Sequence, residues 1–342
     1  MPVFLYAFGR ARRDELPFFS KPQRQPCKNP WLTVRWYYTM PDSTAPTARF
    51  MRSEARMMDL VLSFAREDQR VRLVGMEGSR LDPDAPEDRF RDYDITYIVT
   101  DIGSFIADDA WLDYFGRRII MQKPEAMSLF PPELGGWFSY LMLFTDGNRL
   151  DLKLVPLEEL QKYLTSESRL TILLDKDGML PGPVTPSNRD FVVHPPAAAQ
   201  FDDCCNEFWW VATYVAKGLC RGEFLYAADH LDSYVRPSLL RMLSWEATAC
   251  RPPGTVVPGK SYKYLFRYAP ADTMRQVELS FRNASIAELW DALFLCLELF
   301  RRSSKKTGAM LGYPYPDYDE NVSAYLSSLR DEFSTGRAGN SG

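Results

Sequence analysis

The fold is decided by two stretches of sequence, VRLVGMEGSR at residues 71–80 and DYDITYIVT at residues 92–100. Both are rich in β-branched and aromatic residues, which favour β-strands. Two further strands are predicted at residues 138–144 and 149–155, and the turn Asp146-Gly147-Asn148 between them is typical of a hairpin. These elements predict a mixed β-sheet in the first half of the chain.

Helical and proline-rich segments surround these strands. An amphipathic helix is expected from Met51, with Met58, Val61, Leu62 and Ala65 on one face. A short helix (158–164) and a short strand (170–174) follow the hairpin, and five prolines between residues 181 and 196 indicate a linker. Beyond the linker, apolar residues recur three and four apart, which predicts helices at 201–219, 225–249, 285–302 and 321–333.

We therefore expect an α+β protein with two domains, since chains longer than roughly 250 to 300 residues tend to divide. An α/β domain with a mixed sheet is expected at residues 51–196 and an all-helical domain at 197–335. Residues 1–50 contain seven prolines and no sustained periodicity, so they are interpreted as an extension that takes no part in the fold. Residues 336–342 are expected to form a flexible tail.

Composition excludes several classes of protein. Hydrophobic residues make up 46% of the chain and charged residues 25%, which is ordinary globular usage and unlike collagen, coiled coils or disordered chains. A net charge of −4 argues against a nucleic-acid partner. No apolar run approaches the roughly 20 residues that span a bilayer, so we expect a cytoplasmic protein without a membrane partner. No obligate protein partner is evident. Six cysteines without a CxxC pair, and only two histidines, do not form a zinc motif.

Four Asp-x-Asp pairs occur in the sequence, and their contexts differ. Three lie in turns or loops and are interpreted as structural. The fourth, Asp92 and Asp94, leads into a strand, where side chains two apart share a face. Two neighbouring carboxylates repel each other unless a cation lies between them, and Mg²⁺ prefers such oxygen ligands. The alternative is a solvated strand start with two exposed aspartates.

A Gly-Ser turn follows the first strand, at Gly78 and Ser79. Glycine allows the backbone to approach a phosphate, while Ser79 and Arg80 supply a hydroxyl and a guanidinium. Asp151 lies in the alternating run LDLKL (150–154) and is able to complete a cluster of three carboxylates. A lone aspartate on a strand is otherwise an ordinary surface residue.

This order of motifs resembles the nucleotidyltransferase superfamily of the DNA polymerase β type. EGSR at 77–80, DYDITY at 92–97, LDL at 150–152 with PLEEL at 156–160, and DDCCNEFW at 202–209 are similar to the aminoglycoside 6-adenylyltransferases. The similarity runs from Met51 to about Phe333. It implies Mg²⁺-dependent transfer of AMP from ATP to the 6-hydroxyl of streptomycin, with release of pyrophosphate and inactivation of the antibiotic.

The resemblance also implies roles for individual residues. Ser79 and Arg80 would face the phosphates of ATP, and Asp92, Asp94 and Asp151 would be the metal-binding and catalytic carboxylates. Asp151 would accept the proton of the attacking hydroxyl, with Glu207 as a rival base.

Further binding residues are expected in the second half of the chain. Lys260 follows Gly259 at the head of a predicted helix and resembles the lysine that related enzymes place on the triphosphate; the alternative is a solvated lysine. Two interpretations apply to the acidic residues Asp202, Asp203 and Glu207. Their carboxylates either bind the guanidinium groups of streptomycin or compensate the dipole of a helix.

Other features bear on the same resemblance. Trp209 and Trp210 are interpreted as core residues. Lys153 departs from the small polar residue that is usual in relatives, and it shares a face with Asp151.

Two other functions stay open. One is adenylylation of a different aminoglycoside or another small drug. The other is a non-catalytic nucleotide-binding protein that keeps this fold. Retention of all three carboxylates argues against the second, because a dead site has no reason to keep such repulsive charges together.

Overall fold

The computed structural model describes residues 51–336. The expected extension (1–50) and nearly all of the expected tail lie outside the described residues. The helices and strands are α1 (Glu54–Glu67), β1 (Val71–Glu77), β2 (Tyr93–Val99), α2 (Ile102–Ile106), β3 (Arg118–Gln122), β4 (Phe138–Phe144), β5 (Arg149–Pro156), α3 (Leu160–Leu164), β6 (Leu170–Asp175), α4 (Ala198–Cys220), α5 (Phe224–His230), α6 (Arg236–Ala249), α7 (Ala271–Leu279), α8 (Ile286–Leu311) and α9 (Tyr318–Ser334).

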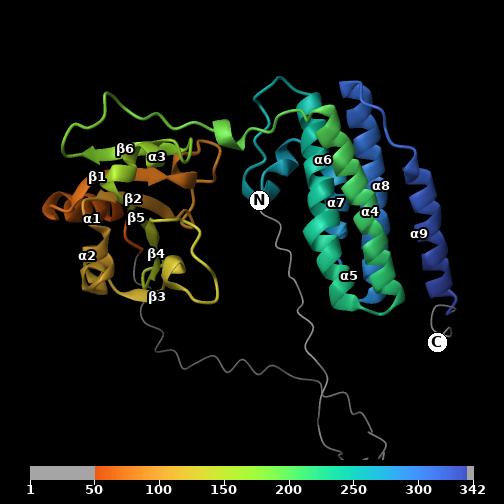
Figure 1. The fold of residues 1–342 in the computed structure, drawn as a ribbon, viewed down its shortest axis with the longest axis horizontal. Helices are drawn as coiled ribbons and strands as arrows, with labels where there is room; N and C mark the ends of the chain where they lie inside the picture. The colour runs from red at the N-terminus through yellow and green to blue at the C-terminus, as the bar shows by residue number, and fades with distance from the viewer. Residues whose placement is uncertain (1–50, 337–342) are drawn as a thin grey trace, which may run out of the picture. The chain divides into compact units, whose positions relative to one another are not determined.

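The strands form one mixed sheet in the order β3-β4-β5-β2-β1-β6 (Figure 1). β2 and β5 run parallel, and every other neighbouring pair is antiparallel. The predicted hairpin is confirmed as β4 and β5, and Gly147 in its turn has a φ of +87°. The expected fold class, a mixed sheet followed by helices, is therefore confirmed.

The two faces of the sheet differ in chemistry because side chains alternate along each strand. One face is apolar and is buried with α1 in a core that includes Val61, Tyr97, Tyr140 and Leu152. The opposite face carries polar side chains at one end of β2 and β5, and a smaller apolar cluster with α3, including Ile98 and Val155, at the other. The buried face thus fixes the register, and the register fixes which polar residues meet on the other face.

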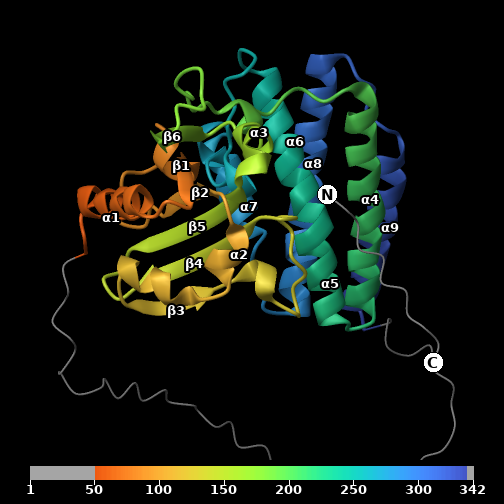
Figure 2. The ribbon, with the colours of Figure 1, turned by 60° about the vertical axis from the view of Figure 1, so that its left-hand side comes forward.

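The helical half has a hydrophobic core of its own. Its buried members all lie between Phe201 and Leu326, whereas those of the sheet region lie between Met57 and Leu170. Helices α4, α6, α8 and α9 run side by side in both ribbon views (Figure 2). The separate cores support a division near residue 196, which stays a prediction.

Several sequence predictions need correction in detail. The expected helix 225–249 is interrupted by a π-helical turn, Leu231–Val235, between α5 and α6. The elements α2, β3 and α7 were not predicted. β3 is an edge strand that pairs with β4 alone and leaves Ile119 and Ile120 exposed, so it lacks the alternation that marks a half-buried strand. On α1, the buried methionine is Met57 rather than Met58.

Of the two adjacent tryptophans of α4, one lies in the core and the other lies on the surface. Trp209 is 1% exposed, and its indole N–H donates to the Tyr315 hydroxyl at 3.2 Å. Trp210 is 59% exposed and donates to the Tyr214 hydroxyl. The interpretation as core residues therefore holds for Trp209 and is wrong for Trp210.

Trp209→Ala is expected to lower the free energy of unfolding by about 3–5 kcal/mol, because it leaves a large cavity beside Phe208 and Phe300. Trp210→Ala, one residue away on the same helix, should cost less than about 1 kcal/mol. Urea denaturation followed by circular dichroism measures both. Equal losses would show that the core does not depend on Trp209.

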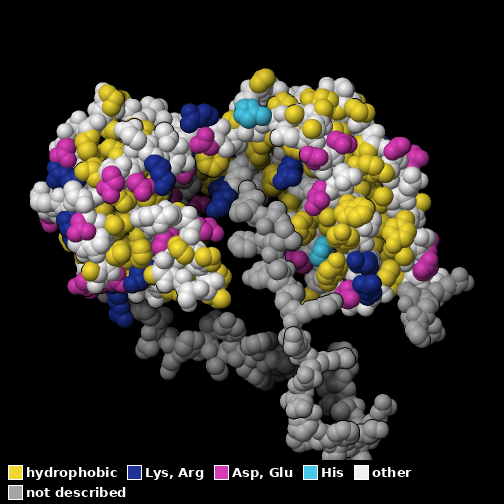
Figure 3. Space-filling view, viewed as in Figure 1, with side chains coloured by type: hydrophobic (Ala, Val, Ile, Leu, Met, Phe, Trp, Pro, Cys, Tyr) yellow, Lys and Arg dark blue, Asp and Glu magenta, His cyan; other side chains and the backbone are white. Residues whose placement is uncertain are grey.

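Acidic and basic side chains are interspersed on the face shown in Figure 3. Among residues 51–336, no helix is both long enough and apolar enough to cross a membrane.

Candidate active site

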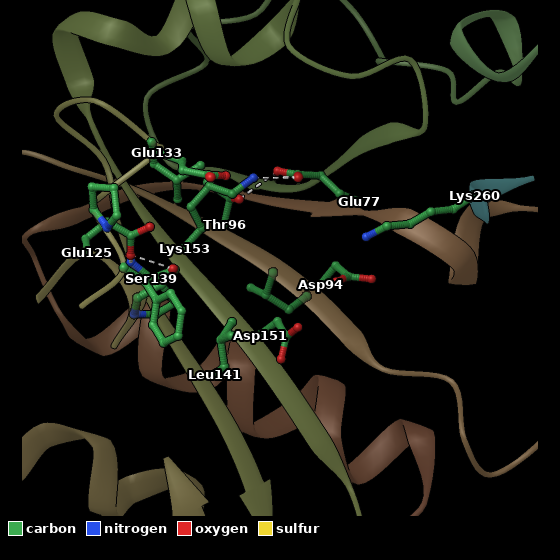
Figure 4. Close-up of a pocket in the computed structure, with 15 residues that line it drawn as sticks. Glu77, Asp94, Thr96, Glu125, Glu133, Ser139, Leu141, Asp151, Lys153 and Lys260 are labelled. Atoms are coloured by element: carbon green, nitrogen blue, oxygen red, sulfur yellow. Dashed lines mark hydrogen bonds and ion pairs between the residues drawn. The ribbon is translucent and has the colours of Figure 1, made fainter. Parts of the chain in front are cut away.

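A row of side chains crosses the polar face of the sheet at one level. Strand register places Asp151 of β5 beside Asp94 of β2, and Asp94 beside Glu77 of β1. Two residues further along β2 and β5, a second row contains Thr96 and Lys153. All five residues line one pocket of about 600 Å³, in which Figure 4 shows them. Of the three carboxylates expected to form a cluster, Asp94 and Asp151 thus lie side by side and line this pocket, whereas Asp92 does not line it.

Asp94 lies at the centre of this acidic row. Burial raises the pKa of Asp94 to about 7, with further contributions from the negative charges of Asp151, Asp92 and Glu77. Among the described residues, no side chain forms an ion pair or hydrogen bond with its carboxylate. Such a group favours a proton or a cation beside it.

Gly78 makes this position of Asp94 possible. Gly78 has a φ of +80°, and a Cβ atom built on it would lie 2.2 Å from the Asp94 Oδ2 atom. A larger residue is therefore opposed both by its backbone conformation and by the carboxylate. Gly78 thus lies close to Asp94, and its approach to a phosphate stays a prediction.

Asp151 is held by a neighbour on its own strand. The Arg149 Nε and Nη2 atoms donate to the two Asp151 carboxylate oxygens at 2.8 and 2.7 Å. The Arg149 Nη1 atom also lies 3.5 Å from Asp92 Oδ2. The bonds to Asp151 raise the pKa of Arg149. Asp92 precedes the first residue of β2 and does not line the pocket that contains Asp94.

A second ion pair lies beside the acidic row. Lys153 Nζ donates to Glu77 Oε2 at 2.7 Å, and the Thr96 hydroxyl donates to Glu77 Oε1 at 2.7 Å. Glu77 is 6% exposed, so both partners are needed to satisfy a buried carboxylate. The unusual Lys153 thus neutralises Glu77 in this structure.

Ser79 and Arg80 lie in a single 3₁₀ turn after β1, outside the set of residues that line the Asp94 pocket. Arg80 donates to the backbone carbonyls of Asp92 and Arg91 at 2.9 Å and stacks over the Tyr93 ring. Its guanidinium therefore anchors the segment that leads into β2. Contact of Ser79 and Arg80 with phosphate stays a prediction.

Lys260 lines the same pocket as Asp94 and Asp151. Its helix is only one 3₁₀ turn, Lys260–Tyr262, preceded by Gly259 with a φ of +72°. Ser261 and Tyr262 also have positive φ angles, which cost energy in residues with a Cβ atom. Lys260 is thus placed in the pocket by a strained turn rather than by the helix that we expected.

The three acidic residues of α4 separate into two groups. Asp203 and Glu207, one helical turn apart, line a small cavity with Arg241 and Trp245 of α6. Asp202 does not line it. α4 begins at Ala198 and has no acidic residue in its first turn, so compensation of the helix dipole is not their role. The helix starts earlier than predicted because Gln200 caps the Ala197 backbone N–H.

The chemistry of the acidic row fits a hard divalent cation. Two carboxylates in adjacent register positions offer only oxygen ligands, which Mg²⁺ prefers. Within residues 51–336, no group of three or more potential metal ligands lies close enough together to hold an ion, and Arg149 is bound to Asp151. Asp94 and Asp151 are the residues that would hold the ion.

Sequence reasoning did not assign Arg149 or Glu77 to the site. Arg149 is two residues before Asp151 on a strand, so the rule that paired Asp92 with Asp94 also predicts that Arg149 and Asp151 share a face. Glu77 was quoted within a motif, but its contact with Lys153 depends on the order of three strands. No local signal in the sequence predicts that order.

The mixed sheet, the Gly-Ser turn and the carboxylates on neighbouring strands define a nucleotidyltransferase. The sequence model of the streptomycin adenylyltransferase family matches residues 51–329, and the chain belongs to this family. The resemblance found in the sequence is thereby confirmed, and the protein is an enzyme.

Several characterised relatives match nearly their whole length. The chain is 49% identical over 280 residues to an aminoglycoside 6-adenylyltransferase of Bacillus subtilis (82% of this chain, 98% of the relative). It is 45% identical over 283 residues to one of Campylobacter jejuni (83% and 98%). A crystal structure of an aminoglycoside 6-adenyltransferase from Bacillus subtilis shares 45% identity with a TM-score of 0.41, covering 82% of this chain and 99% of that one.

Proposed function

We propose that this enzyme transfers AMP from ATP to the 6-hydroxyl of streptomycin in a Mg²⁺-dependent reaction that releases pyrophosphate. The observation that carries the proposal is the pairing of Asp94 with Asp151 in a chain of this family. The names of the relatives support an aminoglycoside as the acceptor.

The reaction joins the acceptor oxygen to the α-phosphorus of ATP and breaks the bond between that phosphorus and the pyrophosphate oxygen. A bound Mg²⁺ would supply neutralisation of the phosphate charge. Asp94 and Asp151 would hold this ion, and Lys260 would attract the triphosphate electrostatically. Asp151 takes the hydroxyl proton, with Glu207 as the alternative base.

Acceptor-dependent release of pyrophosphate tests this proposal. Release from ATP should require both Mg²⁺ and streptomycin, and an aminoglycoside without guanidinium groups should support a much lower rate. Equal rates with both acceptors would reject recognition of the guanidinium groups, no release with streptomycin alone would reject it as the substrate, and no release with any acceptor would reject the transfer itself.

The cavity beside α4 is proposed to bind the cationic acceptor. Asp203 and Glu207 supply carboxylates for guanidinium groups, and Trp245 supplies an aromatic wall. This arrangement supports binding of a guanidinium-bearing drug more than binding of a neutral molecule.

Glu207→Gln is expected to raise the KM for streptomycin roughly 10-fold or more, because it removes a charge-assisted hydrogen bond, and to leave the KM for ATP unchanged. Asp202→Asn is the matched control, since this residue lies on the same helix outside the cavity. Steady-state kinetics with each substrate varied measures both constants. A larger effect for Asp202→Asn would place the acceptor elsewhere.

A further inference from the structure

Arg149 forms an ion pair with one of the carboxylates that the proposed reaction needs. Its guanidinium forms two parallel hydrogen bonds with Asp151, at 2.8 and 2.7 Å, and approaches Asp92 at 3.5 Å. A bidentate pair of this kind engages both oxygens of the carboxylate. While this pair is intact, one lone pair of each Asp151 oxygen is engaged and a positive charge lies beside the carboxylate, which weakens its binding of a metal ion.

The neighbouring carboxylate, that of Asp94, has no such partner. Asp94, beside Asp151 in the sheet register, has no charged or hydrogen-bonding partner among residues 51–336. Glu77, on its other side, is neutralised by Lys153. Along the row, one carboxylate is thus free between two that are held by cations of the chain itself.

The environment of Arg149 allows its release. Arg149 is the first residue of β5, and its side chain is 44% exposed, whereas that of Asp151 is 20% exposed. Its ion pairs within the described residues are with Asp151 and Asp92 only. The guanidinium is therefore able to turn into solvent without breaking other contacts of this kind.

We propose that Arg149 is a positioning residue that stands in for the divalent cation in the nucleotide-free enzyme and must leave Asp151 before the cation binds. This inference rests on the proposed function, in which Asp94 and Asp151 hold the metal. The guanidinium and the metal ion then compete for the same oxygens, and their like charges disfavour simultaneous occupancy.

Competition predicts that removal of Arg149 strengthens metal binding. Arg149→Met is expected to tighten Mn²⁺ binding by the nucleotide-free protein about 10-fold or more, because a bidentate charge-assisted contact no longer has to be broken. Arg149→Lys, which keeps the charge but not the fork, should give an intermediate affinity.

Lys153→Met is the matched control. It removes the same charge from the same strand, four residues further along, but its partner is Glu77 rather than Asp151. Because loss of Lys153 also frees Glu77, this control is made in the Glu77→Gln background, where general electrostatics predicts a small gain in Mn²⁺ affinity, about 2-fold; direct competition predicts the larger gain only for Arg149→Met. In the double variant Arg149→Met with Asp151→Asn, the gain should disappear.

Mn²⁺ titration followed by electron paramagnetic resonance measures these affinities, with thermal melting as the check on folding. Equal or weaker binding by Arg149→Met, or an equal gain for Lys153→Met, would overturn the inference. If the wild-type protein binds no Mn²⁺ even with a non-hydrolysable ATP analogue, the metal site of the proposed function fails first, and this inference fails with it.

Discussion

Asp94→Asn is expected to lower kcat/KM for AMP transfer on the order of 10³-fold while the protein remains folded, by analogy with the loss of one catalytic electrostatic group. The amide keeps the shape of the side chain but removes the charge that binds the metal ion. Pyrophosphate release measures the loss. Residual activity within about tenfold of the wild type would remove Asp94 from the mechanism.

The same substitution has a predictable effect on stability, which serves as its control. The pKa of Asp94 is about 7 in the folded protein and 3.8 in the reference state. Between these values the folded state binds more protons, so this carboxyl lowers the free energy of unfolding as pH rises from about 4 to 7. Asp94→Asn removes that loss. The variant should match the wild type near pH 4 and melt at a higher temperature at pH 8.

Gly78→Ala is expected to impair both activity and stability. Its Cβ atom would lie 2.2 Å from the Asp94 carboxylate, so Asp94 has to move, and the residue has to keep a φ of +80°. We expect a loss of kcat/KM on the order of 10²-fold, as for a catalytic group displaced by about 1 Å. The free energy of unfolding should fall by about 1–3 kcal/mol.

Gly178→Ala is the matched control for the backbone strain that alanine suffers at a positive φ. Gly178 has a φ of +62°, but a Cβ atom there would have no neighbour within 4 Å. The Gly178→Ala variant should therefore lose stability through backbone strain alone and keep its activity. If Gly78→Ala were as active as Gly178→Ala, the close approach to Asp94 would have no catalytic consequence.

Much of the fold followed from local sequence patterns. The alternation of leucines in residues 150–154 and the β-branched run after Asp94 each predicted a strand, and both are strands in the structure. These predictions succeeded because hydrophobic period is a short-range property. Asp319, which was expected in a loop, lies instead in the first turn of α9, where Arg301 binds its buried carboxylate.

The parts of the site that were missed depend on tertiary structure. Lys153 and Glu77 are 76 residues apart and meet only because β2 lies between their strands. Arg80 was expected at a phosphate, and in the structure its guanidinium donates to the Glu54 carboxylate at 2.7 Å and to carbonyls of the segment before β2 at 2.9 Å. A short motif predicts the residue type that the chemistry needs, whereas the direction of a long side chain is decided by its neighbours.

The most direct test of the account is mass spectrometry of streptomycin after incubation with this protein, ATP and Mg²⁺. The account predicts the addition of one AMP unit, absent without Mg²⁺ and absent with Asp94→Asn, with fragmentation placing the AMP on the 6-hydroxyl. Streptomycin of unchanged mass, from a protein that still binds ATP, would contradict it.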